Sequence, residues 1–202
     1  MYGLIMSRYT QSSEDVEPGV FALIREDLHH HWGELTRPGF QALAIHRLRR
    51  QVHRDTARPF AALAGLLLNA FAGIVRYRFG ITIHLTAQLG RRLSIGHQGG
   101  IIIGPNVTMG DDCWILQGVQ IEPDRDRTGL LRSPTIGHRV RIGARSHVRG
   151  DVQVDDDARI GPNSVITVDV PQGATAVARP SRIVRAQAPP SIEPAEDDHA
   201  GG

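Results

Sequence analysis

A six-residue repeat of aliphatic side chains runs through the second half of this 202-residue chain and constrains its fold more than any other feature. The repeated positions are Ile83, Leu89, Ile95, Ile101, Ile103, Met109, Ile115, Ile121, Ile136, Ile142, Val148, Val154, Ile160 and Ile166. A period of six fits neither the 3.6-residue turn of an α-helix nor the two-residue alternation of an isolated strand. It is typical of a hexapeptide parallel β-helix, in which each short strand forms one side of a triangular coil.

Small residues accompany this repeat at fixed offsets. Glycine follows the aliphatic residue directly at Gly90, Gly96, Gly104, Gly110, Gly137, Gly143 and Gly161, where we expect tight corners with positive φ. A second small or apolar residue stands at Val107, Cys113, Val119, Val140, Val152, Ala158 and Ser164. Cys113 is the only cysteine, which excludes an internal disulfide, and its position predicts a core residue rather than a reactive thiol.

The repeat breaks first at the stretch "SIGHQGGIIIG", residues 94–104. The period slips there by two residues between Ile101 and Ile103. His97 and the paired Gly99 and Gly100 stand beside the slip.

The second break lies between Ile121 and Ile136. Fifteen residues separate them where twelve would keep step, so we expect residues 122–134 to bulge out as a loop. Insertions in solenoid repeats commonly map to a binding face, which makes this loop a candidate functional region.

The remaining segments suggest four parts. Residues 1–18 are polar and irregular, and we expect them to be disordered. Apolar spacing of three and four predicts an α-helical domain over 19–78, followed by the β-helix over 79–184. The tail 185–202 is rich in proline, alanine and acidic residues, and we expect it to be disordered as well.

The most apolar segment, Phe60–Val75, is shorter than the roughly 20 residues that span a bilayer. It predicts a buried or an interface helix. The N-terminus carries no basic region followed by an apolar run, so we expect a cytoplasmic protein with no membrane partner.

Charge gives no sign of a polyanionic partner, because 23 basic residues nearly balance 21 acidic ones. The basic stretch His46–Arg54 lacks interleaved aromatic residues, so a solvated helix face is favoured over a nucleic-acid site. The run His29–His31 lies on a predicted helix, where adjacent side chains diverge. We expect a solvated face there, too, rather than a metal site.

The sequence resembles the serine acetyltransferase family of hexapeptide acyltransferases, in its short form. The matching stretches are "RPGFQALAIHRLRR", "ITIHLTAQLG", "SIGHQGGIIIG", "MGDDCWILQGVQI", "RIGARSHVRGDVQV", "ARIGPNSVITVDVPQGATAV" and "RPSRIV", in family order from Arg37 to Val184. The resemblance implies a left-handed parallel β-helix with an N-terminal α-helical domain. It also implies a homotrimer or a dimer of trimers, with acetyl-CoA lying between neighbouring prisms.

The resemblance places His97 at the family's catalytic histidine. Transfer of an acetyl group from CoA to a hydroxyl needs a base and donors for the developing oxyanion. An imidazole suits the base role, and Gly99 and Gly100 leave room for the thioester. Direct transfer to a hydroxyl acceptor, with no metal, is therefore expected.

The acceptor side departs from the family. Thr82 and Gly96 stand where the family has aspartates, and Ser133 stands where a second histidine follows the retained arginine, Arg132. Arg132 would bind the carboxylate of serine.

Glu122, Asp124 or Asp126 in the loop could supply carboxylates for the ammonium of serine, although a solvated loop without this role is favoured. L-serine is the leading acceptor. A sugar, an exopolysaccharide unit or a modified amino acid stays open.

For acetyl-CoA, the resemblance places Gly143 and Ala144 beside the pantetheine arm. Arg145, where the family has a small residue, would narrow the groove or contact a phosphate. Arg182 would lie near the phosphate end.

Two other classes of protein share this fold. A carbonic-anhydrase-type metal lyase would need a close histidine pair, which the candidates His84, His97, His138 and His147 do not supply by their spacing. An inactive binding solenoid remains an alternative. The chain ends in "DDHAGG", so we expect no docking of a C-terminal isoleucine into a partner sulfhydrylase.

Overall fold

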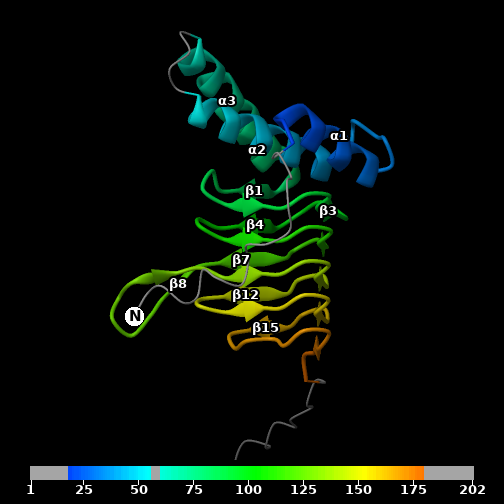
Figure 1. Cartoon of the computed structure of the whole chain (residues 1–202), viewed down its shortest axis with the longest axis vertical. Coiled ribbons are helices and arrows are strands. Elements are labelled where there is room, and N and C mark those ends of the chain that lie inside the picture. Colours follow the sequence, from blue (N-terminus) through cyan, green and yellow to red (C-terminus); the bar gives the residue numbers. More distant parts are fainter. Residues whose placement is uncertain (1–17, 56–59, 180–202) are drawn as a thin grey trace, which may run out of the picture.

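The computed structural model describes residues 18–55 and 60–179, and the terminal segments expected to be disordered lie outside this range apart from Pro18. Three helices come first: α1 (Val20–His30), α2 (Pro38–Arg54) and α3 (Ala61–Phe79). They sit on the first coils of a prism built from short strands (Figure 1).

The strands stack into three parallel sheets, which form the faces of the prism. Face A contains β1 (Ile81–Ile83), β4 (Ile101–Ile103), β7 (Gln120–Glu122), β12 (His147–Arg149) and β15 (Val165–Ile166). Face B contains β2 (Gln88–Leu89), β5 (Thr108–Met109), β10 (Thr135–Ile136) and β13 (Gln153–Val154). Face C contains β3 (Ser94–Ile95), β6 (Trp114–Ile115), β11 (Arg141–Ile142), β14 (Arg159–Ile160) and β16 (Thr175–Ala176). The predicted parallel β-solenoid with N-terminal helices is confirmed.

The hexapeptide positions form the core. All fourteen repeated aliphatic side chains point into the prism, and the most exposed of them, Ile83, has 8% of its surface accessible. The seven accompanying small residues are buried as well, including Cys113, whose thiol donates to the carbonyl oxygen of Gly137 at 3.1 Å. Burial raises the pKa of the Cys113 thiol to about 11, so the thiol is protonated and inert at neutral pH.

The repeat glycines are needed for a reason other than the predicted one. None of them has positive φ, and the left-handed corner positions are held by residues such as Arg92 and Asp112. The next coil instead passes too close for a side chain: a Cβ on Gly110 would lie 2.7 Å from the carbonyl carbon of Gly137. The expectation of positive φ is therefore wrong, and close approach of backbones explains the glycines.

The first break is an insertion of two residues at one corner. Ile83 pairs with Ile103, twenty positions later, whereas Ile103 pairs with Ile121 after eighteen. The extra residues lie between β3 and β4, where Gly99 and Gly100 have φ of 107° and 67°.

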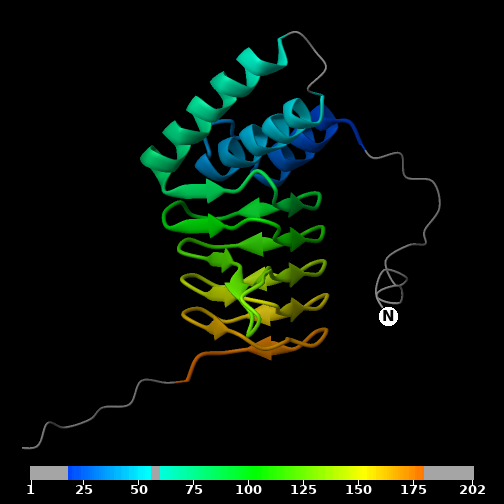
Figure 2. The same cartoon turned by 90° about the vertical axis from the view of Figure 1, so that its left-hand side faces the viewer.

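The second break is larger than predicted. Neighbouring faces of the prism are six residues apart, as from Ile103 to Met109, so the step of fifteen from Ile121 to Ile136 contains nine extra residues rather than three. Strands β7 and β10 lie on neighbouring faces A and B, so a single corner separates Ile121 from Ile136. The extra residues form an antiparallel hairpin of β8 (Asp124–Arg125) and β9 (Leu131–Arg132), which stands out from the prism (Figures 1 and 2).

Buried polar side chains join the helices to the coil. The expected solvated helix faces hold for His29, His30 and His53, which are exposed, but are wrong for His31 and Arg47, which are buried. Arg47 pairs with Asp27 at 3.0 Å and donates to the carbonyl oxygen of Leu89 at 2.6 Å. His31 accepts the backbone N–H of Ile95 on Nε2 at 3.2 Å, and its Nδ1 lies 2.6 Å from the Asp27 carbonyl oxygen. These two side chains dock α1 and α2 on the top of the prism.

Helix α3 forms as predicted, and of the two alternatives, a buried or an interface helix, the single chain excludes the buried one. Val75 is its one buried residue, and the exposed apolar side chains include Leu63, Leu66, Leu67, Phe71 and Ile74. By length and composition alone, α3 is also the one helix of the described residues that could cross a membrane.

Candidate active site

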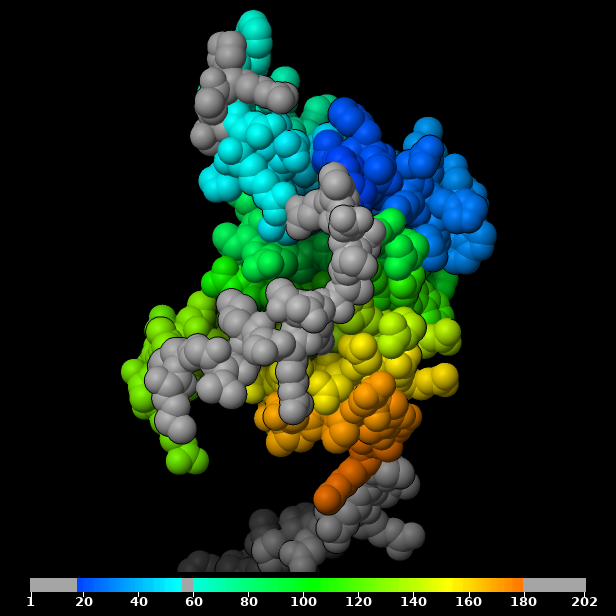
Figure 3. Space-filling model, viewed as in Figure 1, coloured from blue at the N-terminus to red at the C-terminus, as the bar shows by residue number. Residues whose placement is uncertain are grey.

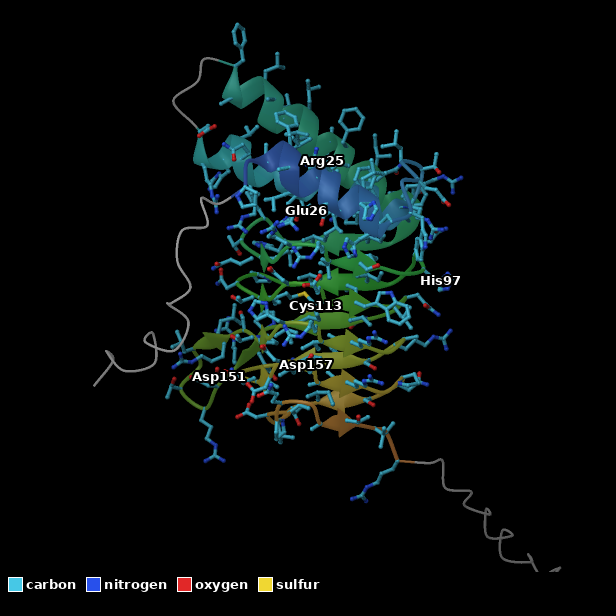
Figure 4. All side chains as sticks on the ribbon, turned by 45° about the vertical axis from the view of Figure 1, so that its right-hand side comes forward. Arg25, Glu26, His97, Cys113, Asp151 and Asp157 are labelled. Atoms are coloured by element: carbon cyan, nitrogen blue, oxygen red, sulfur yellow. The ribbon has the colours of Figure 1, made fainter. Side chains whose placement is uncertain are left out.

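His97 projects from the edge of the prism where face C meets face A. It follows β3 directly and is exposed, and Figure 4 shows it at an outer edge of the coil. The loop behind it is held by a hydrogen bond from the Gly118 N–H to the Gly99 carbonyl oxygen, at 2.7 Å. A Cβ on Gly99 would meet no atom within 4 Å, so the space beside His97 is open.

His97 has no carboxylate to orient its imidazole within the described residues, where it makes no hydrogen bond or ion pair. Thr82 lies on β1 of face A and carries a hydroxyl at the position of the expected aspartate. A Cβ on Gly96 would lie 2.6 Å from Cδ2 of Leu116. A side chain at position 96 would therefore require Leu116 to move.

The described residues that were predicted to bind CoA lie along the same edge, two coils further on. The Arg145 N–H donates to the Gln117 carbonyl oxygen at 2.8 Å, and a Cβ on Gly118 would lie 2.9 Å from Cγ of Arg145. Gly143 and Ala144 precede Arg145 at this corner. The structure thus aligns His97 with three of the four predicted CoA residues, and Arg182 lies outside the described range.

Arg132 and Ser133 lie at the other edge of face A, at the end of the hairpin. Arg132 donates to Asp126 at 3.2 Å, and the Ser133 hydroxyl donates to the Pro105 carbonyl oxygen at 2.8 Å. Asp126 also accepts from the hydroxyl and the N–H of Thr128, and these contacts with Arg132 lower the pKa of Asp126 to about 2. Hydrogen bonds within the hairpin therefore hold Asp126 in place, and Asp126 in turn holds the guanidinium of Arg132.

A single chain does not bring these two groups together. Every strand of face A runs from the edge that carries His97 to the edge that carries the hairpin. Figure 4 shows His97 on one side of the prism and Asp151, which follows β12 at the hairpin edge, on the other. The space-filling view likewise shows the hairpin standing clear of the prism, below the helices (Figure 3).

The sequence does not predict the contact between two polar side chains near the hairpin, Glu122 and His147. His147 Nε2 lies 3.0 Å from Oε2 of Glu122, on the adjacent strands β12 and β7. The signal was available, since both residues occupy outward positions of successive coils. Without the register of the coils, however, the 25 residues between them hide the contact.

The four histidines weighed as metal ligands lie at separate places. His84 contacts Thr86 at 3.0 Å at the edge between faces A and B, and His138 accepts the Asp111 N–H at 3.0 Å at the edge between faces B and C. Within residues 18–55 and 60–179 no group of three metal-ligating side chains occurs.

Comparison with known proteins agrees with this architecture. A family model described as bacterial transferase hexapeptide (six repeats) matches residues 133–167. A serine acetyltransferase of Helicobacter pylori is 38% identical over 150 residues, which cover 74% of this chain and 83% of that protein.

Two solved structures share the fold at 26% sequence identity. A soybean serine acetyltransferase complexed with serine has a TM-score of 0.68 and is matched over 83% of this chain and 70% of its own. A serine acetyltransferase in complex with CoA has a TM-score of 0.67, with 83% and 71% covered. By its sequence identity to these relatives and its fold, the chain belongs to the serine acetyltransferase family.

Proposed function

We propose that this chain transfers the acetyl group of acetyl-CoA to the hydroxyl of L-serine, with His97 as the general base. The similarity to the Helicobacter pylori serine acetyltransferase over most of both chains carries this proposal. The known structures of family members with serine and with CoA support the two substrates. The open corner beside His97 supports the role of this residue.

The chemistry requires one proton to move twice. His97 takes the proton of the acceptor hydroxyl as the oxygen attacks the thioester carbon. The tetrahedral intermediate then collapses, the C–S bond breaks, and the imidazolium returns the proton to the CoA sulfur. A positioned base of this kind contributes about 10²- to 10⁴-fold to the rate.

A different hydroxyl acceptor is the second candidate. It is favoured by one observation, the absence of carboxylates at Thr82 and Gly96, which leaves the edge with His97 without an anion for the serine ammonium.

The active unit is an oligomer in which two chains complete each site, because His97 and Arg132 lie at opposite edges of face A. A homotrimer places the hairpin edge of one prism beside the His97 edge of the next. The exposed apolar side of α3 then joins helical domains of further copies into a dimer of trimers. We propose that the protein is cytoplasmic and uses acetyl-CoA of the cytoplasm as its acyl donor.

A thiol-release assay with acetyl-CoA tests the proposal. The purified chain is given L-serine, L-threonine or glucose, beside a His97→Ala variant and a control, His53→Ala, which removes an exposed imidazole from α2. We expect thiol release with serine, a loss of at least about 100-fold in His97→Ala, and no loss in the control. Turnover that survives in His97→Ala would exclude His97 as the base, and release with glucose alone would move the acceptor to the sugar class.

A further inference from the structure

We propose that Glu122, held by His147, is the subsite for the acceptor's ammonium group. This inference rests on the proposed function, since it assigns the charge that distinguishes serine from a plain alcohol. It concerns the edge of face A that carries the hairpin.

Glu122 and His147 make a diagonal contact across two neighbouring strands, because the register places Gln120 opposite His147 and Arg149 opposite Glu122. Glu122 ends β7, and His147 begins β12, the next strand of face A. The imidazole Nε2 lies 3.0 Å from Oε2 of Glu122, while the two side chains stay 29% and 36% exposed. If Nε2–H donates to Oε2, then Oε1 of the carboxylate is left for a ligand. The alternation of side chains along β7 points Glu122 outward from the sheet, and His147 is a positioning residue that holds its carboxylate in place.

The charges of the neighbouring carboxylates are already matched. Face A and its hairpin carry three carboxylates within the described residues, and two of them face guanidinium groups. Asp124 pairs with Arg149 at 3.0 Å, and Asp126 pairs with Arg132 at 3.2 Å. Glu122 contacts an imidazole instead, and the guanidinium of Arg149, its partner in the strand register, is paired with Asp124. Of these three carboxylates, Glu122 therefore offers the strongest electrostatic attraction to an added ammonium group.

The hairpin places this carboxylate next to a cation for the other end of an amino acid. Asp124 lies two residues after Glu122 and is directly opposite Arg132 in the hairpin register. A guanidinium for a carboxylate and a carboxylate for an ammonium thus stand at one edge. This arrangement suits the α-amino acid part of serine, and it replaces the aspartates that are absent at positions 82 and 96.

Comparison of L-serine with 3-hydroxypropionate, which has the same hydroxyl and carboxylate but no ammonium, tests the subsite. In Glu122→Gln we expect the KM for serine to rise about 10- to 100-fold, the loss of a charge-assisted hydrogen bond, with little change in kcat. The binding constant of 3-hydroxypropionate, measured as substrate or as competitive inhibitor, should stay within about twofold of wild type. Glu122→Asp should recover part of the serine KM.

Two further variants separate this role from a structural one. Asp151→Asn removes an exposed carboxylate that follows β12 at the same edge. This variant should leave the KM for serine and the binding constant of 3-hydroxypropionate unchanged. His147→Gln should raise the KM for serine by less than Glu122→Gln does, because the carboxylate remains.

An equal rise for both acceptors in Glu122→Gln, or no change for serine, would overturn the subsite while the proposed function stands. A wild-type chain that releases no thiol with serine would overturn both.

Discussion

At the junction of the helices and the coil, several buried side chains are polar, and not all of them have hydrogen-bond partners within the described residues. Asp27, His31 and Arg47 hold one another and the coil backbone. His46 is 1% exposed, and neither ring nitrogen has a hydrogen-bond partner in the part of the chain that the structure describes. Burial beside Arg47 lowers the pKa of His46 to about 3, and burial lowers the pKa of His31 as well. Both imidazoles are therefore neutral in the folded chain at neutral pH.

This junction predicts acid sensitivity. Between pH 6.5 and about 3, the His46 imidazole binds a proton in the unfolded chain but not in the folded one. The free energy of unfolding therefore has its full value above pH 6.5. Below that pH it falls by about 1.4 kcal/mol per pH unit for one such group. Urea unfolding at pH 7.5 and 5.5 should show a smaller loss in His46→Leu than in wild type. His53→Leu, an exposed site on the same helix, should keep the wild-type loss, and an unchanged pH dependence in His46→Leu would contradict the account.

The repeat predicted which residues are buried, but not how the polar helix residues are used. Ile115 and Val148 are inward because a six-residue beat fixes the direction of each side chain in the coil. Arg47 lies among several arginines and His31 follows two other histidines. Only the packing of the helices on the coil determines which arginine and which histidine faces the coil. The contact of Glu122 with His147 has the same cause.

At the scale of single elements, the close approach of successive coils makes the corners intolerant of side chains. Gly110→Ala places a Cβ 2.7 Å from backbone atoms of Gly137, and backbone cannot yield as a flexible side chain can. We expect a loss of about 2–4 kcal/mol in the free energy of unfolding. Gly73→Ala is the matched control, because it lies within α3 and a Cβ there meets nothing within 4 Å.

This control should gain about 0.5–1 kcal/mol from helix propensity. Chemical denaturation of both variants distinguishes the two environments. Equal stability of Gly110→Ala and wild type would show that the coils separate more easily than the structure indicates.

The hairpin is an element that the coil does not need. Strands β7 and β10 pair with the coils around them, whereas among the strands of residues 18–55 and 60–179, β8 and β9 pair only with each other. Replacement of residues 124–131 by two glycines should leave the melting temperature within a few degrees of wild type. Thiol release should fall at least about 100-fold, because Arg132 loses its support and its placement. Activity that survives this deletion would remove the hairpin from the site.

At the scale of the whole molecule, α3 leaves an apolar stripe uncovered. Leu63, Leu67, Phe71 and Ile74 recur every three or four residues, so they share one side of the helix, and all four are exposed. A second helix from another copy covers such a stripe best. If α3 forms the proposed contact between trimers, Leu67→Glu should reduce the proposed assembly from six chains to three without unfolding the coil. Sedimentation velocity of both proteins checks this, and a wild-type protein of three chains would exclude the contact.

The fold of the whole chain was predictable because one period runs through most of the coil. The site was predictable only as a set of parts: the repeat located the two breaks, and the family resemblance named His97 and Arg132. That the parts lie at opposite edges of face A follows from the strand order, which sequence spacing does not show.

The most direct test of a shared active site is complementation between two inactive variants. His97→Ala and Arg132→Ala chains are each assayed alone for serine-dependent thiol release and then co-refolded in equal amounts. Each variant alone should be nearly inactive. In mixed assemblies, roughly a quarter of the sites combine an intact His97 edge with an intact Arg132 edge, so about a quarter of the wild-type activity should return. A mixture as inactive as its components, in assemblies shown to contain both chains, would contradict a site built from two chains.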